Sequence, residues 1–450
     1  MAKQTVSQYE KMTQTPIQAL IVSLSIPTII SMLVTNIYNL ADTAFVGRLG
    51  NSASGAVGVV FGFMSIIQAM GFMFGQGSGS IISRLLGQQK PDEASRTAST
   101  GFFYAFIAGI LIAVMSFCCL DNLVMVLGST ETIAPFAKTY ITYILLAAPF
   151  MSSSFLLNNL LRYEGKAALG MVGLLFGGLL NICGDPIFMF VLHMGIAGAG
   201  LSTALSQMVS FCILLSMFLR GKTVCKLSLK NVAPPSALLW NIMATGVPSL
   251  LRQGLGSLST VLLNTQAAVY GDEAVAAMSI VSRIGFFVFS IAIGIGQGFQ
   301  PVSGFNYGAG KYSRVRKAFL FTVVLAEGLM TVIMLAVLFT SGSLIGIFRD
   351  DPKVIEIGTR ALRLHCIALL FLPLCMAGEM LFQSTGHRIG AALLSSMRSG
   401  LFFIPAVILL PRLRGLYGVE EAQPLAYVLA FIPSVAFVLW FFAHMPKEDT

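Results

Sequence analysis

The sequence predicts an all-α integral membrane protein, with twelve transmembrane helices in two six-helix lobes related by a pseudo-two-fold axis along the membrane normal. Three observations support this prediction. Of the 450 residues, 56% are apolar and 10% are charged, whereas a soluble domain carries roughly 25% charged residues. The apolar residues fall into twelve long blocks, and the second half of the chain repeats features of the first.

Each apolar block is long enough to cross a hydrocarbon core, which takes roughly 20 helical residues. The blocks are continuous and rich in Leu, Ile, Val, Phe and Gly, whereas strands of a membrane barrel alternate over about ten residues, so we expect helices. The first block follows sixteen polar residues and exceeds the apolar core of a signal peptide, about 7–15 residues, so we expect it to remain as the first helix. The blocks are 17–41, 53–82, 99–120, 139–161, 167–192, 196–219, 236–269, 274–305, 318–348, 361–384, 389–411 and 425–443.

The basic residues predict the topology. The net charge of +9 is compatible with a nucleic-acid binder, so the placement of the basic residues decides. With the amino terminus inside, alternate loops place 17 of the 28 basic residues in the cytoplasm and eight outside, and Arg252, Arg283 and Arg398 fall inside spans. This bias predicts that both termini of a multi-pass protein lie in the cytoplasm, and it removes the support for a nucleic-acid partner. The seven cysteines show no Cys-x-x-Cys pair, so neither a disulfide framework nor a zinc site is indicated.

An internal repeat appears when the sequence is shifted by 221 residues. The shift aligns Pro27 with Pro248, and Gly75-Gln76-Gly77 with Gly296-Gln297-Gly298. Six helices return the chain to the side on which it started, so the halves are parallel, an arrangement of transporters that bind substrate between halves and work by alternating access. The predicted parts are an amino-terminal lobe at 1–219, a cytoplasmic linker at 220–236 and a carboxy-terminal lobe at 237–450.

Motifs for enzymatic chemistry are weak. The glycines at 75–79 lie inside an apolar span and follow no strand, so close helix packing explains them better than phosphate binding. Gly310-Lys311 lacks the upstream glycine of a Walker motif, because Phe305 stands in its place. The four histidines are far apart, and no metallohydrolase pattern is present. We expect no enzyme activity, no use of ATP and no cofactor.

Polar residues inside the spans are functional candidates, since a charge at the bilayer centre costs at least about 2.5–3.5 kcal/mol. At 1.5 Å of rise per residue, Asp42, Asp185 and Thr203 share a depth in the outer half of the membrane, and Asn181 shares a helix face with Asp185. The four side chains suit Na⁺, which prefers oxygen ligands, or a proton shared between two carboxylates. Pro186 removes a backbone hydrogen bond beside Asp185 and is expected to kink the helix. The alternative for Asp42 is an interfacial aspartate at the end of the first helix.

Two further acids have structural interpretations. Glu327 lies near mid-membrane, and we favour its pairing with an arginine such as Arg283. Glu379 falls near the cytoplasmic end of its span, where a side chain that reaches to the interface is the favoured interpretation.

The sequence resembles the multidrug and toxic compound extrusion (MATE) transporters. The resemblance rests on the segment from Pro27 to Gly47, on the two Gly-Gln-Gly motifs and on Asn181-Ile-Cys-Gly-Asp185-Pro186, and it covers essentially the whole chain. It implies two six-helix lobes, antiport of H⁺ or Na⁺, and export of amphiphilic, often cationic compounds, an activity associated with antibiotic resistance. It also implies that Asp42, Asn181, Asp185 and Thr203 form the cation site of the MepA-like and DinF-like bacterial branch. A NorM-like member has an acid on the seventh helix, where this chain has none between Trp240 and Gly271.

Other parts of the mechanism are less defined by the sequence. A flippase for lipid-linked oligosaccharides or peptidoglycan precursors is the alternative function; it needs a cationic cleft, and the intramembrane arginines keep it open. A passive channel is disfavoured, because it predicts no titratable switch. We expect the protein to function as a monomer in the lipid bilayer, with small amphiphilic substrates as its partners. Candidate residues for the substrate cleft are Gln253, Met278, Arg283, Phe286, Phe289, Met376 and Met380.

Overall fold

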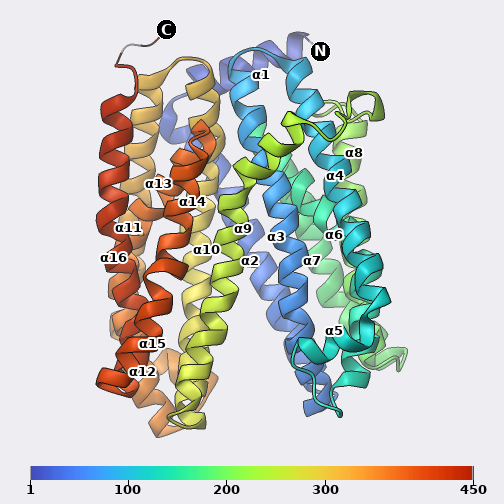
Figure 1. Ribbon diagram of the computed structural model, residues 1–450, viewed down its shortest axis with the longest axis vertical. Helices are drawn as coiled ribbons and strands as arrows, with labels where there is room; N and C mark the ends of the chain where they lie inside the picture. The colour runs from blue at the N-terminus through green and yellow to red at the C-terminus, as the bar shows by residue number, and fades with distance from the viewer. Residues whose placement is uncertain (1, 448, 450) are drawn as a thin grey trace. The chain divides into compact units, whose positions relative to one another are not determined.

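The computed structural model describes residues 2–447 and 449, with side chains from residue 8 onward. These residues form helices and no strand, which confirms the all-α prediction, and the long helices of each part of the chain run side by side (Figure 1). The helices of the first half are α1 (Ala2–Gln14), α2 (Ile17–Gly47), α3 (Asn51–Gly87), α4 (Pro91–Cys118), α5 (Leu120–Val126), α6 (Ala134–Tyr163), α7 (Ala167–Pro186), η1 (Ile187–Val191), α8 (Ile196–Leu219) and η2 (Leu229–Asn231). Those of the second half are α9 (Ala237–Ala268), α10 (Asp272–Gly308), α11 (Tyr312–Phe348), α12 (Pro352–Ala368), η3 (Leu369–Phe371), α13 (Leu372–Thr385), α14 (Arg388–Ser396), η4 (Met397–Leu401), α15 (Phe403–Arg414) and α16 (Leu416–His444).

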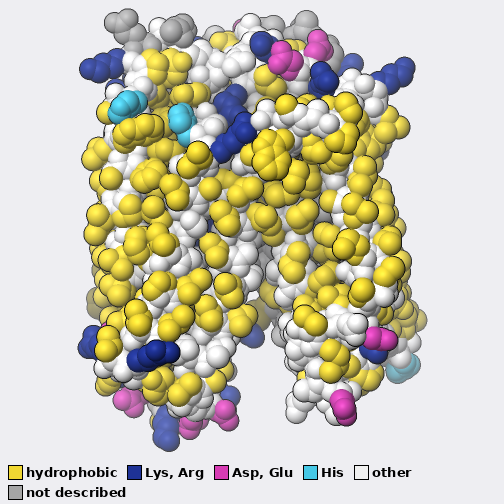
Figure 2. Space-filling model, in the orientation of Figure 1, with side chains coloured by type: hydrophobic (Ala, Val, Ile, Leu, Met, Phe, Trp, Pro, Cys, Tyr) yellow, Lys and Arg dark blue, Asp and Glu magenta, His cyan; other side chains and the backbone are white. Residues whose placement is uncertain are grey.

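Eleven spans of the described residues are long and apolar enough to cross a membrane, and each overlaps one predicted block. The remaining block, 236–269, is the 32-residue helix α9, whose apolar surface is interrupted by polar residues such as Asn241 and Arg252. Figure 2 shows hydrophobic side chains along the flanks of the helices, with charged side chains concentrated near the helix ends. A membrane protein needs this distribution, because its apolar flanks contact lipid and its charged ends contact water.

The chain folds into two compact units, and each unit combines two segments that are separate in the sequence. Unit 1 contains residues 1–14 and 30–250, and unit 2 contains residues 15–29 and 251–450. Helix α2 therefore begins in unit 2 and continues into unit 1, whereas α9 begins in unit 1 and continues into unit 2. We call residues 15–29 and 237–250 the exchanged segments, because each belongs to the unit formed mainly by the other half of the chain. The lobe boundaries predicted from the sequence stay a prediction, and they assign these two segments to the opposite parts.

In unit 1, the first Gly-Gln-Gly motif binds the exchanged start of α9. A Cβ atom on Gly77 would lie 3.1 Å from the carbonyl carbon of Ile242 and 3.1 Å from the amide nitrogen of Gly246. Beside it, the Ser249 hydroxyl donates a hydrogen bond to Gln76 Oε1 at 2.7 Å. Glycine is needed because two backbones meet at this point, which confirms the packing interpretation of the motif.

In unit 2, the second motif makes the corresponding contact with the start of α2. A Cβ atom on Gly298 would lie 2.8 Å from both the Cα and the amide nitrogen of Ser25. The Ser25 hydroxyl donates to the Ile295 carbonyl at 3.4 Å. The repeat offset relates Gly77 to Gly298 and Ser25 to Gly246, so the repeat extends to how each motif packs.

The segment between α8 and α9 is attached to unit 1. The buried Glu164 carboxylate, between α6 and α7, accepts hydrogen bonds from the Val224 and Cys225 amides at 2.8 and 3.0 Å. On α4, the hydroxyls of Ser95 and Ser99 each accept from a linker amide at 3.1 Å. Burial raises the pKa of Glu164, although Lys166 and the two amides act in the opposite direction. The predicted linker is therefore an ordered part of unit 1.

Candidate cation-coupling site

Helices α7 and α8 bring three of the four predicted site residues together inside unit 1. The Asn181 Nδ2 atom donates to Asp185 Oδ1 and to Thr203 Oγ1, in both cases at 3.2 Å. Asn181 and Asp185 meet because residues four apart share a helix face. Thr203 faces them from α8, and neighbouring Ser202 donates to the Asn181 carbonyl at 3.3 Å.

Asp42 joins this cluster through a residue that the sequence did not single out. The Tyr140 hydroxyl, on α6, donates to Asp42 Oδ2 at 3.0 Å and also lies within hydrogen-bonding reach of Thr203. Asp42 is a helical residue of α2 with 8% of its surface exposed, and Asp185 is fully buried. Asp42 is therefore a buried carboxylate within a helix rather than a loop residue. Nothing in the sequence marked Tyr140 except a depth comparable to that of the aspartates.

The cluster has oxygen atoms left over for a ligand. Asp42 Oδ1, Asp185 Oδ2 and Asn181 Oδ1 are buried and have no hydrogen-bond partner among the described residues. A buried polar atom without a partner costs about 1–3 kcal/mol, so three such oxygens in one cluster favour a cation or a proton as the missing partner. Carboxylate, amide and hydroxyl oxygens are the donor set that a hard cation prefers. Within the described part of the chain, no group of three or more His, Cys, Asp or Glu residues could hold a metal ion.

The helix that carries Asp185 changes its winding at the predicted kink. Helix α7 ends at Pro186, and the next residues, Ile187–Val191, form the π-helical turn η1. A proline removes one helical hydrogen bond, and π-helical turns concentrate at functional sites. Asp185 is thus followed at once by the part of its span where the helix is irregular.

The predicted cleft residues have mixed environments within unit 2. Met278, Met376 and Met380 are buried, and Gly296 packs against the Met380 side chain. The remaining four are half-buried or exposed: Gln253, Arg283, Phe286 and Phe289. Their contact with a substrate stays a prediction.

The interpretation of Glu379 as an interfacial side chain is wrong. Glu379 has 3% of its surface exposed and forms an ion pair and a hydrogen bond with Arg252. Its partner lies on a different helix, so depth along its own span gave no sign of the pair. The favoured pairing of Glu327 with Arg283 is absent from the ion pairs of the described residues, and both side chains are incompletely buried.

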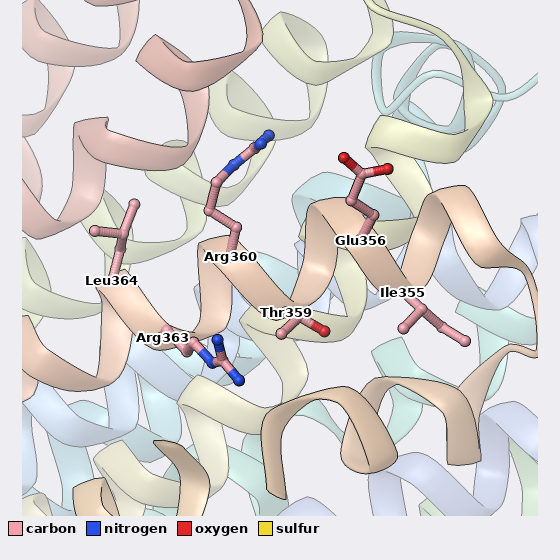
Figure 3. A pocket seen from close by; sticks show the side chains of 6 residues that line it. All are labelled: Ile355, Glu356, Thr359, Arg360, Arg363 and Leu364. Carbon is pink, nitrogen blue, oxygen red and sulfur yellow. The ribbon is translucent and has the colours of Figure 1, made fainter. Parts of the chain in front are cut away.

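An open pocket of about 460 Å³ lies along α12, and none of the predicted site residues lines it. Figure 3 shows Glu356 and Arg360 on one side of the helix and Thr359 and Arg363 on the other. Arg360 donates two hydrogen bonds of 2.5 Å to Glu420, and Arg363 donates one of 2.9 Å to Ser341. These pairs attach α12 to its neighbours, and the pocket is not a candidate for ion coupling.

The chain is similar to known proteins over most of its length. The family model MatE matches residues 27–187 and again residues 248–409, so its two matches start at the repeat-related prolines. The chain is 28% identical to the multidrug export protein MepA of Staphylococcus haemolyticus, with 88% of this chain and 87% of the relative covered. It is 27% identical to MepA of Staphylococcus aureus strain NCTC 8325, over 94% of each protein. A solved structure described as an outward-facing multidrug resistance MATE family transporter of the MOP superfamily matches with a TM-score of 0.91 and 25% identity, over 96% of this chain and 98% of the other.

Proposed function

Since the chain belongs to the MatE family, the multidrug and toxic compound extrusion transporters, we propose that it is a secondary active multidrug efflux transporter of the bacterial cytoplasmic membrane. In this proposal, H⁺ or Na⁺ enters the cell as amphiphilic, often cationic compounds leave by alternating access. Eleven spans of the described residues and the long helix α9 together make up the expected twelve, and the family model matches the chain twice. The relatives named multidrug export proteins support the efflux function.

The cluster of Asp42, Asn181, Asp185 and Thr203 carries the coupling part of the proposal. Three of these residues present buried oxygens that have no partner among the described residues. A bound cation would be held by these oxygens and would neutralise the two carboxylates. An ion shifts a conformational equilibrium only by its differential affinity for the two states. The irregular helix after Pro186 gives a place where α7 can respond to that change in charge.

The proposed orientation places both termini in the cytoplasm. Within unit 2, Arg314 donates to the Thr15 carbonyl at 2.7 Å, and the Ser313 amide donates to Asp449 at 2.7 Å. The start of α2 and Asp449 therefore lie at one end of unit 2, and the basic loops support a cytoplasmic position for that end. The proposal includes a monomer as the working form, and it requires neither ATP nor an organic cofactor.

The variant Asp185→Asn tests the coupling in proteoliposomes loaded with an ethidium-like dye. It keeps the shape of the side chain and removes its charge, so we expect dye binding to persist while Na⁺ or pH gradients no longer drive efflux above the protein-free rate. Asp42→Asn should behave in the same way, and the double variant should be little worse than either single variant because the two acids share one site. Asp92→Asn, at an exposed position on α4, is the matched control.

Efflux by Asp185→Asn at nearly the wild-type rate would refute the coupling role and leave the fold assignment intact. In the same vesicles, a membrane-impermeant thiol reagent reports the orientation. A cysteine placed in the linker at 220–236 should react with it only when the cytoplasmic face of the protein is on the outside of the vesicle. The alternative flippase function loses support from Arg252, because Glu379 already occupies its guanidinium.

A further inference from the structure

Arg398 lies near the middle of the span Arg388–Arg414, inside the π-helical turn η4 (Met397–Leu401). It follows Arg388, the first residue of that span, by ten residues, or about 15 Å of helix. The hydrocarbon core is about 30 Å thick, so this places the guanidinium close to the bilayer centre. An arginine at that depth is expensive, and it marks a functional site by default.

Two aromatic rings hold the guanidinium from different helices of unit 2. The Cζ atom of Arg398 lies 4.5 Å from the ring centroid of Phe289 on α10 and 5.5 Å from that of Tyr427 on α16. The buried His365 packs on the Tyr427 ring with centroids 5.6 Å apart. Cation–π contacts position an arginine without neutralising its charge, and they leave its in-plane N–H donors available.

The positive charge at this place exceeds the negative charge. Glu379 is within electrostatic reach of both Arg252 and Arg398, but its carboxylate is ion-paired with Arg252. Among the described residues, Arg398 belongs to no ion pair with Glu379 or with Glu327. The charge of Arg398 also reaches His365 and Cys375, and neither of these side chains is a carboxylate.

The side chain of Arg398 is also only half-buried, as is that of Phe289. A mid-membrane arginine that is incompletely covered faces a water-filled cavity or a ligand rather than lipid. A purely structural arginine would be expected to have a carboxylate partner, as Arg252 does in the same unit. The uncovered donors, the two rings and the excess positive charge together describe a site for a flat, apolar group that bears an anion.

We propose that Arg398, with Phe289 and Tyr427, binds the anionic group of an amphiphilic substrate, specifically an aromatic carboxylate or sulfonate, so that the transporter also accepts organic anions. This proposal rests on the efflux function and extends its substrate range beyond cations. The guanidinium binds a carboxylate through two parallel hydrogen bonds, and the rings contact the aromatic part of the substrate.

The test uses two fluorescent probes with the same fluorophore, the carboxylate dansyl-glycine and the uncharged dansyl amide, and purified protein in lipid nanodiscs. We expect the wild-type protein to bind the carboxylate more tightly. Arg398→Gln should weaken carboxylate binding by about 10-fold or more, since hydrogen bonds to charged groups contribute about 1.5–3 kcal/mol. Binding of the amide should change little. Arg398→Lys should keep part of the carboxylate affinity, because the charge remains and the planar fork is lost.

Arg412→Gln is the matched control, since Arg412 is an exposed arginine of the same span. An unchanged carboxylate affinity in folded Arg398→Gln would overturn the proposal. Equal affinities of the wild-type protein for the two probes would overturn it as well, without any variant. The wild-type protein could instead bind the carboxylate more tightly than the amide and yet show no gradient-driven dye efflux. That result would contradict the efflux function and leave the anion site standing.

Discussion

Replacing Gly77 by alanine should disrupt the contact between α3 and the exchanged start of α9. The added Cβ would lie 3.1 Å from the carbonyl carbon of Ile242 and from the amide nitrogen of Gly246, and still closer to the Ile242 carbonyl oxygen. Carbon atoms in favourable contact are about 3.5–4.0 Å apart, so the two helices must separate by at least roughly 0.4–0.9 Å. The opposing atoms belong to the backbone, so no side-chain rotation relieves the overlap. Overpacking of this kind destabilises a protein by about 1–3 kcal/mol.

Gly58→Ala is the matched control on the same helix, because a Cβ at Gly58 would meet nothing within 4 Å. Both substitutions gain the same helix propensity, roughly 0.5–1 kcal/mol. The difference between the two variants therefore isolates the overpacking cost of about 1–3 kcal/mol.

The measurement is the thermal unfolding midpoint in one detergent. The scan rate is fixed, because the apparent midpoint of a protein that unfolds irreversibly depends on it. For a unit of this size, about 2–4 °C per kcal/mol applies, so Gly77→Ala should melt roughly 2–12 °C below Gly58→Ala. Equal midpoints would refute the argument that this glycine is required by contact between backbones. Gly298→Ala should show the same loss, because Gly298 meets Ser25 in unit 2 in the corresponding way.

Two further outcomes concern buried carboxylates. Glu379→Gln removes the anion that the buried Arg252 guanidinium binds, so we expect the free energy of unfolding to fall by about 3–5 kcal/mol. Chemical denaturation measures this loss. If adding Arg252→Met does not recover stability, the loss does not come from an unpaired buried charge. Burial raises the pKa of Glu164, whereas an undocked carboxyl titrates near its ordinary value of about 4.3. Linkage then makes linker docking strongest below that value and weaker as the pH rises through the raised pKa. Hydrogen-exchange protection of the Val224 and Cys225 amides, corrected for the intrinsic rate, should fall over that range, and Glu164→Gln should abolish the trend.

The sequence was informative wherever position along a single helix decides the outcome. Depth and helix face were enough to bring Asn181, Asp185 and Thr203 together, because both follow from regular helical rise and rotation. Both failed for Glu379, whose partner Arg252 is 127 residues away in the chain. Tyr140 was missed for the same reason, since its hydroxyl reaches Asp42 across 98 residues.

The repeat shows a similar division between what sequence predicts and what it does not. Matching glycines at a constant offset predicted that the halves are alike and that the motif packs helices. The offset carried no information about which helix is packed. Each motif holds the start of a helix whose remainder belongs to the other unit, and only three-dimensional contacts reveal this exchange.

The exchange of helix starts imposes an order on biosynthesis. A ribosome delivers residues 15–29 to the membrane early, yet the backbone against which Ser25 packs, at Ile295 and Gly298, emerges some 270 residues later. Until then, residues 15–29 lack the backbone against which Ser25 packs in the folded protein, and they remain in lipid or in the insertion machinery. Unit 1 in turn is incomplete until residue 250 has been made. A gene divided at the linker would therefore yield two fragments, each of which lacks one segment of its own unit and carries one that belongs to the other.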